Sequence, residues 1–371
     1  MTMTQIMWKS LLMKLMHGEH LNADESEWFV DDLMKGNANP TMVGAVLATQ
    51  QSNGLTAEEI AGASKAMVGH AVPLPVAAEA TDIVGTGGDG AHTVNLSTMG
   101  AIVAAAAGVT VVKHGNRASS SQCGAADCLE ALGMPLDLSP QSVAKIAGET
   151  GITFAFAKTF HPAMRFVGPV RAALGVPCVF NVLGPLTNPA HPKHVAIGCA
   201  NRALSPIMAQ VYAANGQTGM VYTSAEGLDE MAPTGPISVW EFRDGTVSEQ
   251  EFDPTVELGL DAITIDDLRG GMPEVNAQAV RDFLAGKDVP FRTTALLNAA
   301  SAIVADGRQV PANGTLAERF QAAYALAEQA VDSGKAEALL NTWIETAQRY
   351  AKAEAEAAAE AQDQGETAVE A

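Results

Sequence analysis

Short apolar runs rich in β-branched residues alternate with helical segments from about residue 81 onward, and this alternation constrains the fold more than any other feature. The runs are TDIV (81–84), VTVVK (109–113), ITFAFA (152–157), HVAIGCA (194–200) and MVYTS (220–224). Strands that alternate with helices in this way form a parallel sheet covered by crossover helices. We therefore predict an α/β domain with a mostly parallel central sheet flanked by helices.

The residues before this region carry helix punctuation and no strand-like run. Asn22 with Glu25 and Thr56 with Glu59 have the spacing of capping boxes, and Asn39 precedes a proline at a first helical position. We expect a small helical domain over residues 1–75 and an α/β domain over 76–350.

Three later segments have patterns of their own. Residues 161–175 read as a helix, and residues 179–189 (VFNVLGPLTNP) are expected to be irregular. Two strand-like runs flank Arg243-Asp244-Gly245, which predicts a β-hairpin. The chain is helical again from about 315, and residues 351–371 form an acidic, low-complexity tail that is either a fraying helix or disordered.

Composition narrows the classes of partner. The formal net charge of -20 argues against binding to nucleic acid or to an anionic membrane. The longest apolar run, residues 99–112, is shorter than the roughly 20 residues of a spanning helix, and residues 1–20 resemble an amphipathic helix rather than a signal peptide. The cysteines, at 123, 128, 178 and 199, have no CxxC spacing. We expect a reduced, cytoplasmic protein.

The stretch GTGGDGAHTVNLST (85–98) follows the first expected strand, and its glycines and polar side chains are typical of an anion-binding loop. It matches G-x-G-x-x-G, but the next strand ends in Lys113-His114 where an NAD site needs a carboxylate, so only an NADP enzyme would fit. A P-loop is excluded because Ala91 and His92 replace its Lys and Ser/Thr. The remaining interpretation is a phosphate cradle, in which the glycines lead into a helix that begins near Asn95, although Asn95 could instead be a simple helix cap.

Two more polar clusters follow expected strands. KHGNRASSS (113–121) combines positive charge, a glycine and hydroxyl donors directly after VTVV. Asp229 and Glu230 follow MVYTS, where they are either surface charges or ligands for Mg²⁺ that bridges to phosphate oxygens. Ligands collect at the carboxyl ends of strands in such sheets, so we expect one shared pocket. The scattered histidines do not suit zinc.

These motifs occur in an order that resembles the anthranilate phosphoribosyltransferase family of tryptophan biosynthesis. The resemblance runs from about residue 10 to about 345 and rests on GTGGD (85–89), N-x-S-T (95–98), KHGNR (113–117), GAADCLEALG (124–133), FNVLGPLTNP (180–189) and GLDE (227–230). It implies a helical domain that includes helices from about 161–190, an α/β domain, and a homodimer formed through the helical part. The chain departs from the family at Cys123, commonly serine, and at 223–226, where many members carry a His-Gly pair.

The resemblance also implies a set of site residues. Phosphoribosyl pyrophosphate (PRPP) would be bound by Gly85, Gly88, Asp89, Thr93, Asn95, Leu96, Ser97, Thr98, Lys113, His114, Gly115, Asn116, Arg117, Ala118, Ser119, Ser120, Ser121 and Ala125. Anthranilate would contact Gly85, Asn116 and Arg171, with His114 nearby, and two Mg²⁺ ions per subunit would bind at Ser97, Asp229 and Glu230. Arg171 suits the carboxylate of anthranilate because arginine grips carboxylates in bidentate fashion.

The reaction that the resemblance implies is transfer of the phosphoribosyl group of PRPP to the amino group of anthranilate, and it needs no covalent nucleophile. Stabilising the departing pyrophosphate and positioning the amine are sufficient, so we predict direct displacement with inversion at C1 of the ribose. Three alternatives remain: a pyrimidine-nucleoside phosphorylase, which carries K-H-S-T-G-G where this chain has KHGNR, an NADP oxidoreductase, and a catalytically silent relative that binds nucleic acid. The -20 charge and the intact GLDE argue against the last.

Overall fold

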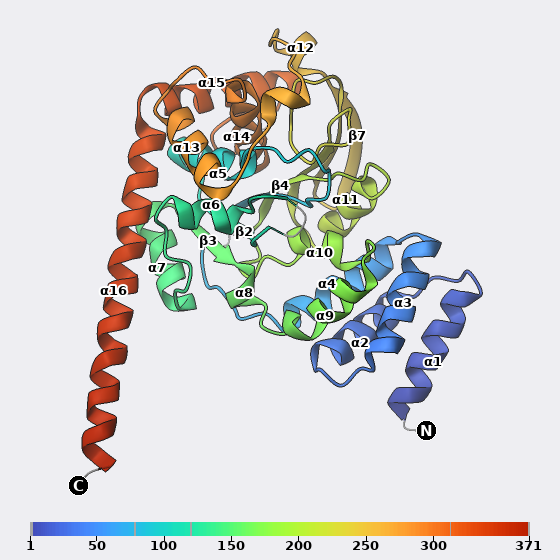
Figure 1. The fold of residues 1–371 in the computed structure, drawn as a ribbon. Coiled ribbons are helices and arrows are strands. Elements are labelled where there is room, and N and C mark those ends of the chain that lie inside the picture. The colour runs from blue at the N-terminus through green and yellow to red at the C-terminus, as the bar shows by residue number, and fades with distance from the viewer. Residues whose placement is uncertain (1–2, 78, 119–120, 312, 370–371) are drawn as a thin grey trace.

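The computed structural model describes residues 3–77, 79–118, 121–311 and 313–369. Its centre is a seven-stranded sheet in the order β3-β2-β1-β4-β5-β6-β7 (Figure 1). The strands are β1 (Thr81–Gly85), β2 (Val111–Gly115), β3 (Ile152–Phe156), β4 (His194–Gly198), β5 (Thr218–Thr223), β6 (Ile237–Arg243) and β7 (Thr246–Phe252). β1 to β5 pair in parallel, whereas β6 and β7 are antiparallel. The predicted fold class and the hairpin at 243–245 are therefore confirmed.

Four helices precede the sheet, as the capping signals predict. They are α1 (Met3–Met16), α2 (Ala23–Met34), α3 (Pro40–Asn53) and α4 (Ala57–Gly69). Asn22 and Thr56 begin α2 and α4 in complete capping boxes, and Asn39 caps α3 ahead of its first-turn proline. Each cap satisfies amide groups that have no partner inside the helix, which sets where the helix starts.

The remaining helices lie between and after the strands. They are α5 (Leu96–Ala106), α6 (Ala125–Ala131), α7 (Pro140–Thr150), α8 (Ala157–Phe160), α9 (Met164–Leu174), α10 (Phe180–Leu186), α11 (Ser205–Ala214), α12 (Pro254–Glu257), the 3-10 helix η1 (Ile265–Leu268), α13 (Pro273–Leu284), α14 (Arg292–Asp306), α15 (Leu316–Asp332) and α16 (Lys335–Val369). None of the described helices is long and apolar enough to cross a membrane.

Two apolar clusters cover the two faces of the sheet. α5 and α14 pack on one face, and α11 packs on the other. Side chains of a strand alternate between the faces, so Ala196 joins the first cluster while Val195 and Ile197 join the second. The second cluster continues without a break into α1 to α4, α9 and α10. The helical unit therefore shares its core with one face of the sheet.

The structure corrects one expectation. The sequence predicts an irregular segment over residues 179–189, but α10 spans Phe180–Leu186. Burial of Phe180, Leu183 and Leu186 outweighs the poor helix propensity of the glycine and proline in this segment. Pro185 lies in the last turn, where it removes only one backbone hydrogen bond.

The C-terminal segment is helical up to Val369, which selects the helix from the two alternatives for the tail. Figure 1 shows α16 along the side of the α/β part that is opposite to the helical unit, with its end extending beyond the rest of the molecule. Glu354 docks this helix onto the start of α7, because its Oε1 accepts hydrogen bonds of 2.5 Å from both Ser139 and Ser142.

Candidate active site

The site lies where the chain changes direction across the sheet. β1 is followed in the chain by β2 on one side, whereas its other neighbour is β4. Gly85 and Gly198 are register partners at the carboxyl ends of β1 and β4. Open α/β sheets bind ligands at such a switch point, outside the carboxyl ends of the strands. The glycine-rich loop leaves β1 here and leads to α5.

The acidic loop crosses directly over these paired strand ends. A Cβ atom added to Gly198 would lie 1.6 Å from Asp229 O, and one added to Gly85 would lie 2.1 Å from Asp229 Oδ2. Only hydrogen fits at either position. Asp229 Oδ2 accepts a 2.6 Å hydrogen bond from the Gly87 N–H, so the glycine-rich loop and the acidic pair are in contact as predicted.

Burial disfavours the ionised form of both carboxyl groups in this acidic pair. Asp229 and Glu230 are 8% and 7% exposed. Burial, with the nearby Asp89, raises the pKa of Asp229 to about 7. Burial and the Asp229 carboxylate raise the pKa of Glu230 well above its usual range. Glu230 Oε2 is buried and has no hydrogen-bond partner among the described residues. A cation at this position would favour the ionised form of both carboxyl groups and would give Glu230 Oε2 a partner.

The donor set suits Mg²⁺ that shares its coordination with a ligand. Among the described residues no three His, Cys, Asp or Glu side chains form a preformed metal cage. Mg²⁺ commonly takes one or two carboxylates and completes its shell with water and phosphate oxygens, so Asp229 and Glu230 fit it. The backbone of Ser97 at the start of α5 lies close to Glu230, and its Oγ accepts a hydrogen bond from Lys113.

Lys113 lies beneath the loops. It is 1% exposed, and its ammonium donates to Ile83 O at 2.7 Å and to Ser97 Oγ at 3.1 Å. Burial lowers its pKa, while the carboxylates of Asp82 and Glu230 oppose that shift. The structure thus places Lys113 as a positive support under the predicted site, and direct contact with a phosphate stays a prediction.

Two buried histidines line the side of the site towards the helical unit. The rings of His114 and His161 are 5.1 Å apart, and His114 Nδ1 lies 2.9 Å from Gly184 O of α10. Burial lowers the pKa of His114 to about 3 and that of His161 to about 4, so both are neutral at pH 7. The sequence motifs do not single out His161 as a site residue. Its position shortly after the carboxyl end of β3 was the available signal.

The polar segment 113–121, which follows β2, is held in place by contacts with α6. Arg117 pairs with Asp127 and Glu130 at 2.9 and 2.8 Å, and Asp127 also accepts from the Ala118 and Gly124 N–H groups. Arg117 is therefore engaged with carboxylates in this structure. Asn116, Ser121 and Ala125 lie along the same loop and the start of α6, next to Gly115 at the end of β2, and Ser119 and Ser120 lie outside the described residues.

The predicted residues at the start of α5 are also brought to this place. Asn95 is the N-cap residue, but its side chain accepts no bond from the helix, which excludes the simple cap. Thr98 Oγ1 is buried and lacks a partner among the described residues. Leu96 is buried in the core, Thr93 forms a bridge with Arg269, and Asp89 accepts from the Ala91 N–H at 3.0 Å. Gly88, with a φ of 86°, lies in the loop between them.

Arg171 lies in the last turn of α9. It takes part in none of the ion pairs found between described residues. Its guanidinium lies near Cys178, where it opposes the rise in the pKa of the thiol that burial causes. Cys178 precedes α10, whose Gly184 contacts His114.

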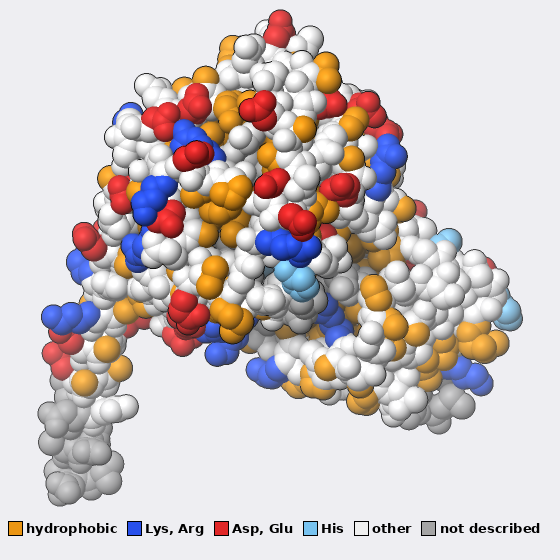
Figure 2. Space-filling model, turned by 45° about the horizontal axis from the view of Figure 1, so that its top comes forward, with side chains coloured by type: hydrophobic (Ala, Val, Ile, Leu, Met, Phe, Trp, Pro, Cys, Tyr) orange, Lys and Arg blue, Asp and Glu red, His pale blue; other side chains and the backbone are white. Residues whose placement is uncertain are grey.

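Figure 2 shows acidic, basic and histidine side chains adjacent to one another near a hollow at the boundary with the helical unit.

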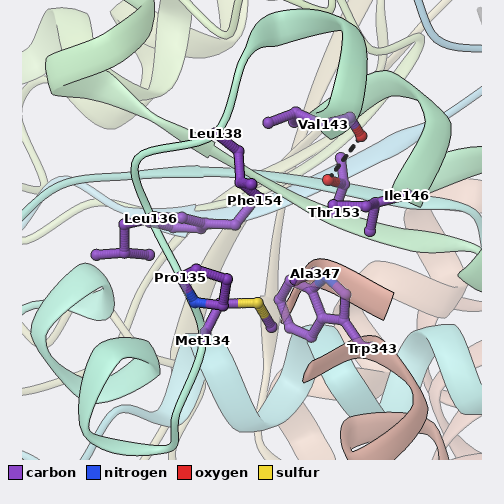
Figure 3. A pocket seen from close by; sticks show the side chains of 10 residues that line it. All are labelled: Met134, Pro135, Leu136, Leu138, Val143, Ile146, Thr153, Phe154, Trp343 and Ala347. Carbon is purple, nitrogen blue, oxygen red and sulfur yellow. Dashed lines mark hydrogen bonds between the residues drawn. The ribbon is translucent and has the colours of Figure 1, made fainter. Parts of the chain in front are cut away.

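Two cavities lie away from these strand ends. One is an apolar crevice of about 10 Å³ between β3, α7 and α16, bordered by Met134, Phe154 and Trp343 (Figure 3). It is at the limit for a single water molecule. The other, of about 620 Å³, lies between the helical unit and the segments that precede β4 and β5. It opens at the amino ends of the strands, opposite the predicted site.

Comparisons with known proteins agree with this architecture. The helical bundle domain of the glycosyl transferase family matches residues 9–71, and the a/b domain of that family matches residues 77–337. Anthranilate phosphoribosyltransferase from Arthrobacter sp. (strain FB24) is 50% identical over 337 residues, which cover 91% of this chain and 95% of that protein.

Two solved structures have the same fold. The crystal structure of anthranilate phosphoribosyltransferase from Thermus thermophilus has a TM-score of 0.84 and 38% identity, with 91% of this chain and 99% of that chain covered. The enzyme from Saccharomyces cerevisiae in complex with PRPP and Mg has a TM-score of 0.82 and 28% identity, with 92% and 98% covered. On its two matched domains and its similarity to these relatives over nearly their whole length, the chain belongs to the anthranilate phosphoribosyltransferase family.

Proposed function

We propose that the protein transfers the phosphoribosyl group of PRPP to the amino group of anthranilate, giving N-(5-phosphoribosyl)anthranilate and pyrophosphate, in tryptophan biosynthesis. The observation that carries this proposal is the hydrogen bond between Gly87 and Asp229, because it joins an anion-binding loop to a buried acidic pair at the switch point of the sheet. The relatives support the substrates, since the yeast enzyme has been described with PRPP and Mg.

PRPP would bind along the glycine-rich loop and the start of α5, next to the end of β2. Gly85, Gly88 and Asp89 line the first part of this path, and Thr93, Asn95 to Thr98 the second. The N-terminal end of α5 attracts anions through its free amide groups and dipole. Lys113 would contribute positive charge from below, which the nearby carboxylates of Asp82 and Glu230 favour, and the segment from His114 to Ser121, with Ala125, would supply further donors.

Asp229 and Glu230, with Ser97, would hold Mg²⁺. When bound, the ion would stabilise negative charge on the departing pyrophosphate. Asp229 packs against Gly85 and Gly198 and accepts from the Gly87 N–H, so its carboxylate faces the glycine-rich loop before the substrate arrives. We propose two ions per subunit, a stoichiometry that calorimetric titration with Mg²⁺ and pyrophosphate would measure.

Anthranilate would lie between the phosphoribosyl group and the helical unit. Arg171 and Asn116 would bind and orient it, next to Gly85. The neutral rings of His114 and His161 would border an aromatic ligand without repelling the positive charge that develops on the ribose. The aromatic amine is neutral at pH 7 and needs no strong base. We therefore propose direct displacement with inversion at C1.

We also propose that the protein is a homodimer formed through the helical unit. Met7, Met13 and Met16 on α1 and Val176 after α9 are large apolar side chains that are exposed in the single chain. Exposed apolar side chains on one unit of a protein often mark an interface. Sedimentation of the wild type and of a Met13→Lys variant would test this, because only an interface there predicts dissociation of the variant.

The reaction can be followed by the loss of anthranilate fluorescence in the presence of PRPP and Mg²⁺. Parallel assays with a pyrimidine nucleoside and phosphate, and with NADPH, separate the alternative activities. An inactive wild type in the first assay would contradict the proposal. The Asp229→Ala/Glu230→Ala double variant should stay folded and lose turnover. A double variant with wild-type kcat/KM at limiting Mg²⁺ would exclude the metal role of this pair.

A further inference from the structure

A buried asparagine on α13 contacts the proposed PRPP-binding loop. Asn276 is 1% exposed, although it lies on a helix whose neighbouring positions 274, 275 and 278 are exposed. Its Nδ2 donates to Asn95 Oδ1 at 2.8 Å, and its Oδ1 accepts from the Gly271 N–H at 2.8 Å. A buried amide is costly unless its groups are paired, so these contacts indicate a specific task.

The contacts fix the direction of two side-chain amides in series. The Gly271 N–H can only donate, so it must meet the oxygen of Asn276. The amino group of Asn276 then points to Asn95 and requires the oxygen of Asn95 to face it. Asn95 Nδ2 in turn donates to Cys123 O at 3.3 Å, and a carbonyl can only accept. The relay from Gly271 to Cys123 therefore leaves Asn95 one orientation.

That orientation matters for an anionic ligand. The Asn95 oxygen is occupied by Asn276 and by the Cys123 thiol at 3.3 Å, so it does not cap α5. The amide end of α5 stays open, and the second N–H of Asn95 Nδ2 is available as a donor. The segment that precedes α13 also contacts this loop through its backbone: Val94 N donates to Leu268 O at 2.9 Å, and Gly270 N donates to His92 O at 2.8 Å.

We infer that Asn276 is a positioning residue for PRPP: it orients the Asn95 amide so that a donor faces the pyrophosphate or ribose and the N-terminal end of α5 stays free for phosphate. The inference rests on the proposed function. Asn276 acts only through Asn95 and the 92–95 loop, so it should affect the binding of PRPP and leave the chemical step and the anthranilate subsite unchanged.

The test is a double-mutant cycle with Asn276→Ala and Asn95→Ala. Loss of one hydrogen bond to a charged ligand predicts that Asn276→Ala raises the KM for PRPP about tenfold, while kcat and the KM for anthranilate stay within about twofold. In the Asn95→Ala background, the same change should alter the KM for PRPP less than about twofold, because its target is gone. Gln278→Ala, an exposed change on the same helix, is the matched control and should leave all constants unchanged.

Stability is measured alongside by thermal unfolding. If Asn276→Ala does not fold, Asn276→Asp is carried through the same cycle: it keeps the acceptor for the Gly271 N–H and reverses the requirement at Asn95. Additive effects in the two backgrounds, or a variant that lowers the melting temperature without raising the KM for PRPP, would overturn the inference while leaving an active wild type in place. A wild type without activity towards PRPP and anthranilate would instead contradict the proposed function and this inference with it.

Discussion

A methyl group added at the end of β4 should disable the site by moving Asp229. In Gly198→Ala the new Cβ would start 1.6 Å from Asp229 O, whereas real Cβ contacts are essentially never below 3.0 Å. β4 is hydrogen-bonded to β1 on one side and β5 on the other, so the strand cannot retreat. The acidic loop must therefore move by at least about 1.4 Å, and a displacement of about 1 Å at a reacting centre can cost about a hundredfold in rate.

We expect Gly198→Ala to lose at least about a hundredfold in kcat/KM and to require more Mg²⁺ for half-maximal activity. The readout is the loss of anthranilate fluorescence with PRPP over a Mg²⁺ titration. Gly219→Ala is the matched control. A Cβ there would lie 1.9 Å from Val195 O, but at the amino end of β5, away from the acidic pair. The control should lower the melting temperature and keep the kcat/KM of the folded protein. A folded Gly198→Ala variant with wild-type kcat/KM would refute the reasoning.

Three further predictions concern charge and docking. Glu230→Gln should raise the melting temperature, since it replaces a buried carboxyl group whose ionised form the fold disfavours, and lower kcat/KM by about a hundredfold or more. His161 has a folded-state pKa of about 4, below the value of about 6.5 in the unfolded chain, so stability is lost as the pH falls below 6.5. Relative to His161→Gln, the wild type should lose about 2 kcal/mol of unfolding free energy between pH 7 and pH 5, as measured by urea titration. Glu354→Ala removes the acceptor for Ser139 and Ser142 and should destabilise the protein by about 1–3 kcal/mol, and an unchanged urea midpoint would exclude that docking role.

Much of the framework could be predicted from local patterns. The caps at Asn22, Asn39 and Thr56 depend on contacts within one helical turn, and the strands depend on short runs of β-branched residues, so both are written locally. α10 could not be predicted because its glycine, proline and asparagine disfavour a helix in isolation. It forms because the helical unit and the sheet bury its apolar face, which no local pattern records.

The candidate site shows the same division. The strand-end rule correctly brought the glycine-rich loop, Lys113 and Asp229 to one place, since parallel strands end at one edge. It could not show that Lys113 is buried with its ammonium bound to Ile83, because that depends on how α5 covers β1 and β2. Asn276 gave no signal either: its partner is 181 positions away, and a polar residue in an amphipathic helix normally faces solvent.

The shared apolar core bears on how the molecule can close around its substrates. The second apolar cluster runs from Phe29 and Val46 in the helical unit to Val195 and Val221 in the sheet. A wide swing of the helical unit about a pair of linkers would expose this surface to water. Small sliding of packed helices over the sheet keeps it covered, so shear rather than a free hinge is the motion that this construction permits.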